Sequence, residues 1–292
     1  MTHYIGIDMG GTKILGGRFT ASGDLIASEQ APTYPIPDSD PFAQLVAFIQ
    51  RLQGDDALQG IGIGVPGAVV DGQVNLAAAL AWDGFPLVER LQQQFDVAIS
   101  AENDVNLAAL GEHRFGRGRG TQNMLCIAVG TGIGAGLILN GMLYQGYQGV
   151  AGEVGYMLPD VASLDQTYDD FGALELIAGG HGIAQRARNR YGNDVTAAHV
   201  FQQSRAGDLW AIKLVRQVAD ALALMIGNIS MILAPERVIL SGSVMQSADV
   251  LLPRIRSRLT GSIPIIPDIV TSQLGAQAAL YGAVSLVLPQ HE

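Results

Sequence analysis

The sequence predicts an α/β protein with mixed sheets and two domains, and three observations lead to this fold class. Short apolar runs that end in glycine-rich turns alternate with segments of helical periodicity. A theme of strand, glycine-rich turn and strand opens at Tyr4 and recurs at Met124. Between the two copies lies Phe115–Gly120, a stretch of glycine and arginine typical of a solvated linker. The 292 residues, of which 48% are hydrophobic and 37 are glycine, suffice for two cores.

We therefore expect an N-terminal domain over residues 1–115 and a C-terminal domain over residues 116–292. A helix at about 274–288 is expected to pack back onto the first domain. In that domain the four prolines of Pro32–Pro41 predict a loop. The apolar patterns predict strands at Tyr4–Asp8, Ile14–Phe19, Leu25–Gln30, Ile61–Val65 and Val97–Ala101, and helices at Phe42–Leu52, Leu87–Phe95 and Asp104–Arg114.

In the second domain the turn Asn140-Gly141 predicts a hairpin. Apolar residues at helical spacing from Val215 to Ile229 predict a helix, which Pro235 ends. The predicted strands are Met124–Val129, Ala135–Leu139 and Val238–Leu240, the last followed by the small-residue turn Ser241-Gly242-Ser243.

The charge balance and the single cysteine argue against several classes of protein. A net charge of −10 disfavours a nucleic-acid binder, whereas backbone amides and a metal ion can still hold an anion such as ATP. Cys126 lies alone in an apolar run, so we expect a buried strand residue and neither a disulfide nor zinc. The N-terminus lacks a leader pattern, and the apolar stretches Leu222–Ala234 and Leu274–Leu288 fall short of the ~20 residues of a membrane span. A cytoplasmic protein with no membrane partner is expected.

The first motif that can carry chemistry is Asp8-Met9-Gly10-Gly11-Thr12-Lys13, at the end of the first predicted strand. Its glycines let backbone amides approach phosphate oxygens, and Thr12 and Lys13 add donors. Asp8 is a candidate Mg²⁺ ligand, because hard cations prefer carboxylate oxygen. The alternative is an ordinary tight hairpin.

The second motif is Gly130-Thr131-Gly132-Ile133-Gly134-Ala135-Gly136. It matches the dinucleotide-binding pattern G-x-G-x-x-G superficially, but that pattern requires a helix immediately afterwards. Here Leu137-Ile138-Leu139 and a hairpin turn follow, so a Rossmann site is disfavoured. The sequence also lacks a Walker A motif. Two glycine-rich hairpins from two domains fit a phosphate clamp better.

The third motif is Glu102-Asn103-Asp104-Val105-Asn106, at a predicted passage from strand to helix. A carboxylate at such a junction can accept a proton from an attacking hydroxyl, while an amide binds a neighbouring hydroxyl. The alternative is helix capping by Asn103 or Asp104, which is common for these residue types.

Taken in order, these motifs resemble the ROK sugar kinases, whose fold is the two-domain actin-like ATPase fold (hexokinase/RNase H-like) with mixed sheets and a central cleft. The resemblance runs from Ile5 to about Gly282. It rests on Asp8–Lys13, Gly64–Gly67, Glu102–Asn106 with Leu110-Gly111-Glu112, Phe115–Gly120, Gly130–Gly136, Gly152–Gly155, Leu174-Glu175 and Ser241–Val244.

The resemblance implies a role for each matching position. Asp104 is expected to be the general base, and together with Asn103 and Gly67 to bind the sugar. Glu153 and Glu175 are expected to bind hydroxyls toward the anomeric end, with plain surface solvation as the alternative. The ATP phosphates are expected against Gly10, Gly11, Thr12, Lys13, Gly130, Thr131 and Gly132, with Gly242 beneath the adenosine.

Two positions depart from the family pattern. Most members carry a zinc-binding histidine where this sequence has Tyr156, followed by three cysteines where it has Tyr168–Ala173. Structural zinc is therefore not expected, and Tyr156 is expected to touch the sugar instead. A polar sugar contact is also missing in Ala78–Ala81, and Asn75 is a candidate replacement.

The function that we expect is ATP-dependent phosphorylation of a small sugar, first of all a hexose at its 6-hydroxyl, with Mg²⁺. Fructose, an N-acetylhexosamine or a β-glucoside are alternative acceptors. A sugar-responsive repressor of the same family would carry a DNA-binding segment ahead of Tyr4, and a silent sugar sensor would be expected to lose Asp104 or a phosphate loop. The resemblance also implies a homodimer, and domain closure on sugar binding is expected.

Overall fold

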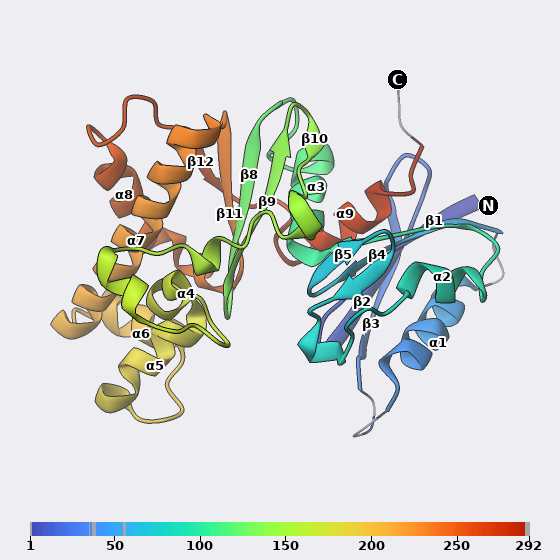
Figure 1. Cartoon of the computed structure of the whole chain (residues 1–292), viewed down its shortest axis with the longest axis horizontal. Coiled ribbons are helices and arrows are strands. Elements are labelled where there is room, and N and C mark those ends of the chain that lie inside the picture. Colours follow the sequence, from blue (N-terminus) through green and yellow to red (C-terminus); the bar gives the residue numbers. More distant parts are fainter. Residues whose placement is uncertain (1, 35, 37–38, 55–56, 290–292) are drawn as a thin grey trace. The chain divides into compact units, whose positions relative to one another are not determined.

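The computed structural model describes residues 2–34, 36, 39–54 and 57–289, and these form two compact units (Figure 1). Unit 1 holds the chain up to Gly120, the segment Leu143–Ala151 and the chain from Ala276 onward. Unit 2 holds Thr121–Met142 and Gly152–Gly275. The predicted loop Pro32–Pro41 includes residues 35, 37 and 38, which lie outside the described residues.

Unit 1 is built on a five-stranded mixed sheet with the order β3-β2-β1-β4-β7. Strands β1, β2 and β3 are antiparallel neighbours, whereas β1, β4 and β7 run parallel. The strands are β1 Thr2–Met9, β2 Lys13–Phe19, β3 Leu25–Pro32, β4 Ala57–Val65 and β7 Ala98–Asn103. The helices are α1 Pro41–Gln53, α2 Leu87–Gln92, α3 Asp104–Phe115 and α9 Ala278–Ser285, with a small hairpin of β5 Ala68–Val70 and β6 Gln73–Asn75. Mixed strands and covering helices confirm the predicted α/β class.

Glycine alternates with β-branched residues along β4. The β-branched side chains therefore lie on one face of the sheet, and the glycines lie on the other. Ile61 and Ile63 are fully buried in the core that α1 and α2 cover. On the opposite face a Cβ at Gly62 would lie 1.7 Å from the carbonyl oxygen of Ala283 in α9. Helix α9 therefore packs backbone to backbone against the sheet, which only glycine permits. Figure 1 shows α1 on one side of this sheet and α9 on the other.

Unit 2 repeats the pattern of hairpin and parallel strands in a second five-stranded sheet, with the order β10-β9-β8-β11-β12. Strand β8 pairs antiparallel with β9 and parallel with β11, as β1 does with β2 and β4. The strands are β8 Met124–Val129, β9 Ile133–Leu139, β10 Met142–Leu143, β11 Arg237–Ser241 and β12 Asp268–Thr271. The helices are α4 Ala173–Ala178, α5 Gly180–Tyr191, α6 Ala197–Arg205, α7 Leu209–Leu233 and α8 Ala248–Leu259.

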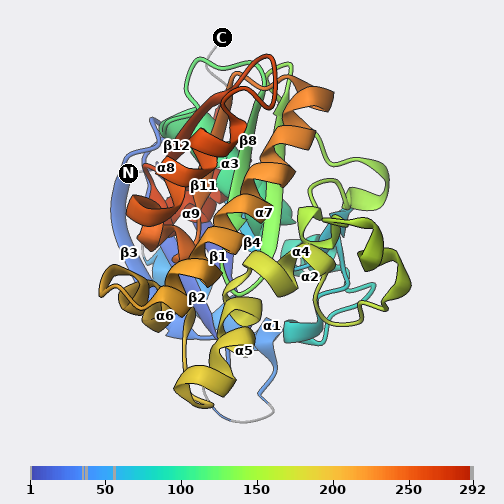
Figure 2. The same ribbon diagram turned by 90° about the vertical axis from the view of Figure 1, so that its left-hand side faces the viewer.

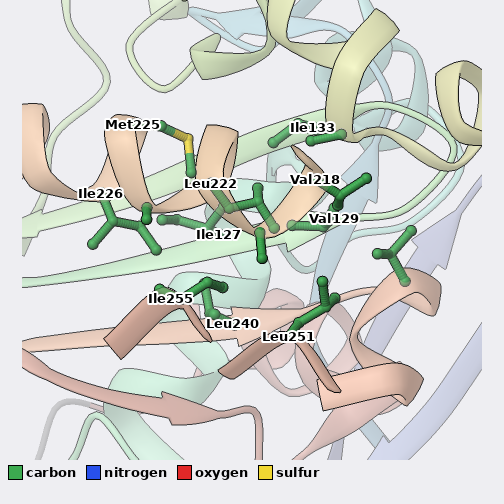
Figure 3. Packing of buried hydrophobic residues seen from close by; sticks show 14 of the residues in the cluster. Ile127, Val129, Ile133, Val218, Leu222, Met225, Ile226, Leu240, Leu251 and Ile255 are labelled. Carbon is green, nitrogen blue, oxygen red and sulfur yellow. The ribbon is translucent and has the colours of Figure 1, made fainter. Parts of the chain in front are cut away.

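The core of unit 2 lies between its sheet and the helices α7 and α8, which Figure 2 shows in front of β8 and β11. The apolar face predicted from Val215 to Ile229 belongs to α7, which ends at Ala234 in a left-handed conformation just before Pro235. Cys126 is buried in β8, as predicted. Figure 3 shows the interlocking side chains Ile127, Val129, Val218, Leu222, Met225, Ile226, Leu240, Leu251 and Ile255.

Several elements are not among those predicted from the sequence, including the β5–β6 hairpin and the helices between Ala173 and Arg205. Short 3₁₀ turns also occur, among them Tyr147–Gly149, Val154–Tyr156 and Ser243–Ser247. Among the described residues, no helix combines the length and the apolar character needed to cross a bilayer.

We expect Gly282→Ala in α9 to lower the free energy of unfolding by about 3 kcal/mol. A Cβ there would lie 1.8 Å from the carbonyl oxygen of Leu107 in α3, so α9 and α3 would have to separate. Gly227→Ala in α7 is the matched control, because its added Cβ meets only side-chain methyl groups, the nearest at 3.1 Å. Urea unfolding of both variants measures the difference. Equal stability of the two would show that the close α9–α3 contact is unimportant.

Candidate active site

The junction between β7 and α3 holds the third sequence motif. Strand β7 ends at Asn103 and α3 begins at the next residue. The side-chain oxygen of Asn103 accepts hydrogen bonds from the N–H groups of Val105 (2.9 Å) and Asn106 (3.1 Å). The capping alternative is therefore correct for Asn103. Its amide nitrogen donates one hydrogen to the carbonyl of Gly67 (2.9 Å), and the amide has a second hydrogen for a ligand.

Gly67 is the turn residue after β4, and its geometry requires glycine. Its φ is +88°, and a Cβ there would lie 2.3 Å from the carbonyl oxygen of Asn75. The side-chain oxygen of Asn75 accepts a hydrogen bond from the N–H of Gly84 (3.1 Å), which closes the loop after β6. Asn75, the predicted replacement for a missing sugar contact, thus has a structural bond of its own.

Asp8 and Asp104 form an electrostatically coupled pair of carboxylates in unit 1. Each lies at the carboxyl end of a parallel strand, and such ends meet at one edge of a sheet. Burial and, after it, the charge of Asp8 raise the pKa of Asp104 to about 6, against the opposing effect of a hydrogen bond from the N–H of Val105. Burial also raises the pKa of Asp8 to about 6, although Lys13 partly opposes this. The site therefore holds a carboxyl group whose pKa lies about one unit below neutral pH.

The glycine loop between β1 and β2 is braced from behind by Thr33, which the sequence patterns do not reveal. Thr33 is fully buried. Its hydroxyl donates to the carbonyl of Gly10 (2.6 Å), and its N–H donates to the carbonyl of Thr12 (3.0 Å). Because a trans peptide is planar, the N–H groups of Gly11 and Lys13 point away from Thr33. The loop thus presents donors on one side, as an anion site needs.

Glycine is also sterically required in this loop. A Cβ at Gly11 would lie 2.6 Å from the Cβ of Ala79, whereas a Cβ at Gly10 would make only an ordinary contact. The predicted phosphate residues Thr12 and Lys13 are exposed, so their side chains are free to meet a ligand. The structure thus assembles Gly10, Gly11, Thr12 and Lys13 as one exposed turn.

The glycine loop of unit 2 is oriented in the same way by the start of α5. The N–H of Gly180 donates to the carbonyl of Gly130 (2.7 Å), and the N–H of His181 donates to the carbonyl of Thr131 (3.1 Å). The N–H groups of Thr131 and Gly132 therefore point away from α5. Two unrelated braces, a buried threonine and a helix N-terminus, produce donor-lined loops in the two units.

Glu175 connects this loop to α4. One of its carboxylate oxygens accepts the N–H of Ile133 (2.7 Å), and the other accepts the N–H of Gly172 (2.7 Å). A Cβ at Gly132 would lie 2.2 Å from the first oxygen, so a larger residue would displace the Glu175 carboxylate. Each oxygen still has a lone pair for a sugar hydroxyl. Plain surface solvation of Glu175 is wrong, because the residue braces the loop.

Tyr156 lies in the same part of unit 2 as Glu175 and Glu153. The Tyr156 residue is 47% exposed. Desolvation, and after it the carboxylates of Glu175 and Glu153, raise the pKa of its phenol. Glu153 itself is exposed. The structure therefore brings together the three residues of unit 2 that the sequence predicts to bind sugar.

A cavity of about 520 Å³ in unit 2 opens beside the second glycine loop. This volume suits a drug-sized or nucleoside-sized ligand. Gly242 precedes Ser243, which lines the cavity. Its φ is +91°, and a Cβ there would lie 2.4 Å from the carbonyl oxygen of Val129. The α5 and α6 part of the wall has no contiguous motif and is missed by sequence reasoning. The lining includes Thr131, His181, Ala184, Ala198, Phe201 and Ser247.

A metal site made of protein side chains alone is not found. Within residues 2–34, 36, 39–54 and 57–289, no three His, Cys, Asp or Glu side chains gather closely enough to hold a metal ion. The carboxylates of Asp8 and Asp104 suit a hard cation. Their negative charges repel each other in a partly buried site, and a bound cation would offset this repulsion.

Two mixed sheets of like topology, each with a glycine-rich turn after its first strand, define the actin-like ATPase fold. The ROK family profile matches residues 4–290, and the chain belongs to the ROK family. It is 31% identical to a glucokinase of Halalkalibacterium halodurans, covering 98% of this chain and 95% of the relative. It is 30% identical to an N-acetyl-D-glucosamine kinase of Pectobacterium atrosepticum, covering 98% and 99%.

A solved structure agrees with these sequence comparisons. The ROK family glucokinase from Streptomyces griseus, in complex with glucose and AMPPNP, superimposes with a TM-score of 0.80 and 27% identity. The match covers 98% of this chain and 99% of that one. The predicted family and fold are thereby confirmed.

In metal-free buffer at pH 7.5, we expect Asp104→Asn to raise the free energy of unfolding. The carboxyl pKa rises from 3.8 to about 6 on folding, so the buried charge costs on the order of 3 kcal/mol at this pH. An amide oxygen can still accept the N–H of Val105. A carboxyl with a raised folded pKa becomes protonated as the pH falls through 6, so the advantage of the variant should shrink between pH 6 and 4. Urea unfolding with EDTA at several pH values measures this, and a variant less stable than wild type at pH 7.5 would contradict it.

Proposed function

We propose that this protein transfers the terminal phosphate of ATP to a hydroxyl of a small sugar, with Asp104 as the general base. The observation that carries the proposal is the position of Asp104, at the start of α3 and beside Asp8, with a pKa of about 6. A base is most effective when its pKa lies near the working pH, because it is then both ionised and a good proton acceptor. The similarity to a glucokinase and to an N-acetyl-D-glucosamine kinase supports the same reaction.

Asn103 and Asp104 are proposed to orient the attacking hydroxyl. The amide of Asn103 is fixed by its cap and by Gly67, so its second hydrogen has a set direction. Asp104 accepts the hydroxyl proton as the new bond to phosphorus forms. In a loose transition state this proton transfer comes late, so Asp104 acts first as an orienting group.

The ATP phosphates are proposed to bind the two glycine loops, Gly10–Lys13 and Gly130–Gly132. The outward N–H groups described above supply fixed dipoles for the charge that develops on the phosphoryl oxygens. The adenosine is proposed to occupy the cavity next to Gly242. Mg²⁺, held by Asp8 with Asp104 nearby and by the phosphates, would neutralise charge on the transferred group when bound.

The acceptor is proposed to be a hexose, with its anomeric end toward Glu153, Tyr156 and Glu175. Carboxylates and a phenol suit this role because a polyol offers donors to each. We place glucose first and keep fructose, an N-acetylhexosamine and a β-glucoside as alternatives, because Tyr156 adds bulk where the family pattern has histidine. The predicted domain boundary, the cleft, the closure on sugar binding, the homodimer and the cytoplasmic location stay predictions.

With ATP and Mg²⁺, we expect sugar-dependent ADP release with at least one of glucose, fructose, mannose, their N-acetylamino forms or cellobiose. Asp104→Asn should lower kcat by roughly 10²–10⁴, because the proton acceptor is lost while the cap and the fold persist. Asp268→Asn is the control, since the Asp268 side chain forms an exposed ion pair with Arg237 in unit 2. A coupled ADP-release assay gives both results. Near-normal turnover in Asp104→Asn would remove its role, and no turnover with any sugar would overturn the proposed function.

A bulky side chain in the cavity of unit 2 tests the adenosine site. Ala198 lines the cavity from the exposed first turn of α6, so we expect Ala198→Trp to raise the KM for ATP by about 10-fold or more. The KM for the sugar should stay within about 2-fold of wild type. Asn189→Trp is the matched control, because Asn189 is exposed on α5 and does not line the cavity. Equal KM values for ATP in the two variants would place the nucleotide elsewhere.

A further inference from the structure

Glu102 is a buried carboxylate that the proposed chemistry does not use. It is the residue before Asn103 in β7 and is only 4% exposed. One of its oxygens accepts the N–H of Asn103 (2.7 Å) and the side-chain amide of Asn106 (3.0 Å). Asn106 is itself buried in the first turn of α3. Glu102 therefore hydrogen-bonds the residues on both sides of Asp104, Asn103 and Asn106, within the buried part of the junction.

The second oxygen of Glu102 accepts a hydrogen bond from the side-chain amide of Gln145. Gln145 belongs to Leu143–Ala151, a segment that the chain contributes to unit 1 between two stretches of unit 2. A buried carboxylate oxygen with no donor costs free energy, because the lost hydration is not replaced by a hydrogen bond. The exposed Gln145 thus supplies the donor to the second oxygen of Glu102, while the donors to its first oxygen, Asn103 and Asn106, belong to the junction.

The segment also packs against the β5–β6 hairpin, because a Cβ at Gly149 would lie 3.2 Å from the carbonyl oxygen of Val69. It contains no long helix or strand, and Gly146, Gln148 and Gly149 all have positive φ. The N–H of Ala151 donates to the carbonyl of Gln145 (2.9 Å), which closes the segment into a loop with Gln145 at its start. The chain then continues directly into Gly152–Tyr156, which carries two of the proposed sugar-binding side chains.

We propose that Glu102 is a positioning residue that, through Gln145, fixes the segment Leu143–Ala151 to the junction bearing Asn103 and Asp104. Sugar affinity depends on this bond, because the bond connects the residues that orient the attacking hydroxyl with the chain leading to Glu153 and Tyr156. ATP affinity does not depend on it, since neither glycine loop takes part. The inference rests on the proposed sugar-kinase function and adds a determinant of its sugar site.

Gln145→Leu removes the donor at an exposed position and is expected to fold. We expect the KM for the accepted sugar to rise by about 10-fold, the usual effect of losing a hydrogen bond to a charged group. The KM for ATP should stay at its wild-type value, whereas the melting temperature should fall by a few degrees, because the second oxygen of Glu102 loses its donor. Gln148→Leu is the matched control, since Gln148 has the same side chain in the same segment and bonds only to the neighbouring Tyr147.

Exchanging the two partners separates positioning from general structural damage. Gln145→Glu places two carboxylates together, so kcat/KM for the sugar should fall by about 100-fold. Adding Glu102→Gln restores one donor and one acceptor with the roles reversed, and also keeps an oxygen for Asn103 and Asn106. The double variant should recover to within about 5-fold of wild type, a strong coupling between the two sites.

Three results would overturn the inference. They are an unchanged sugar KM in Gln145→Leu, an equal rise in Gln148→Leu, and a double variant no better than Gln145→Glu. If the wild-type protein phosphorylates no sugar, the proposed function fails and the inference falls with it. If the wild type is active and the Gln145 variants match it, only the inference fails.

Discussion

The direct passage from β7 into α3 is the constraint on which the positions of Asn103 and Asp104 depend. No loop separates strand from helix, so Asn103 is both the last strand residue and the cap of the helix. Consecutive side chains at such a junction have directions set by backbone hydrogen bonds. Glu102 points into buried polar contacts, Asn103 caps, and Asp104 stands at the helix start. The helix dipole favours an anion at that position, yet desolvation outweighs it and raises the pKa of Asp104.

A second constraint is shared by the two glycine loops. An anion site made of backbone amides needs peptide planes that face one way, and the glycines alone do not impose this. In unit 1 Thr33 holds two carbonyls from behind, and in unit 2 the first N–H groups of α5 do so. The two glycine-rich loops thus have similarly oriented carbonyl groups, although the groups that hold those carbonyls differ between the units. In unit 2 a Cβ at Gly132 would also displace the Glu175 carboxylate that braces the loop.

The sheet of unit 1 shows how residues without side chains position the site. Gly6, Gly62 and Gly64 lie on one face, where α9 or α3 touches the backbone, while Ile61 and Ile63 fill the other face. The strand ends that carry Asp8 and Asn103 are thereby held between two packed layers. Rigid strands hold a side chain at a more precise position than loops do.

Sequence alone determined the class of fold, most of the strands and the three motifs, because short-range periodicity and turn chemistry set these. It also predicted roles for Asp104 and both glycine loops, because motifs in a fixed order can be read along the chain without knowledge of contacts. Only the tertiary structure decided that Asn103 caps α3, that Thr33 and Glu175 act as braces, and that Glu102 bonds Gln145. Each of these depends on partners more than 20 residues away or on a choice between two local conformations. Local sequence patterns cannot predict such contacts, because these hydrogen bonds form only after distant segments of the chain have packed together.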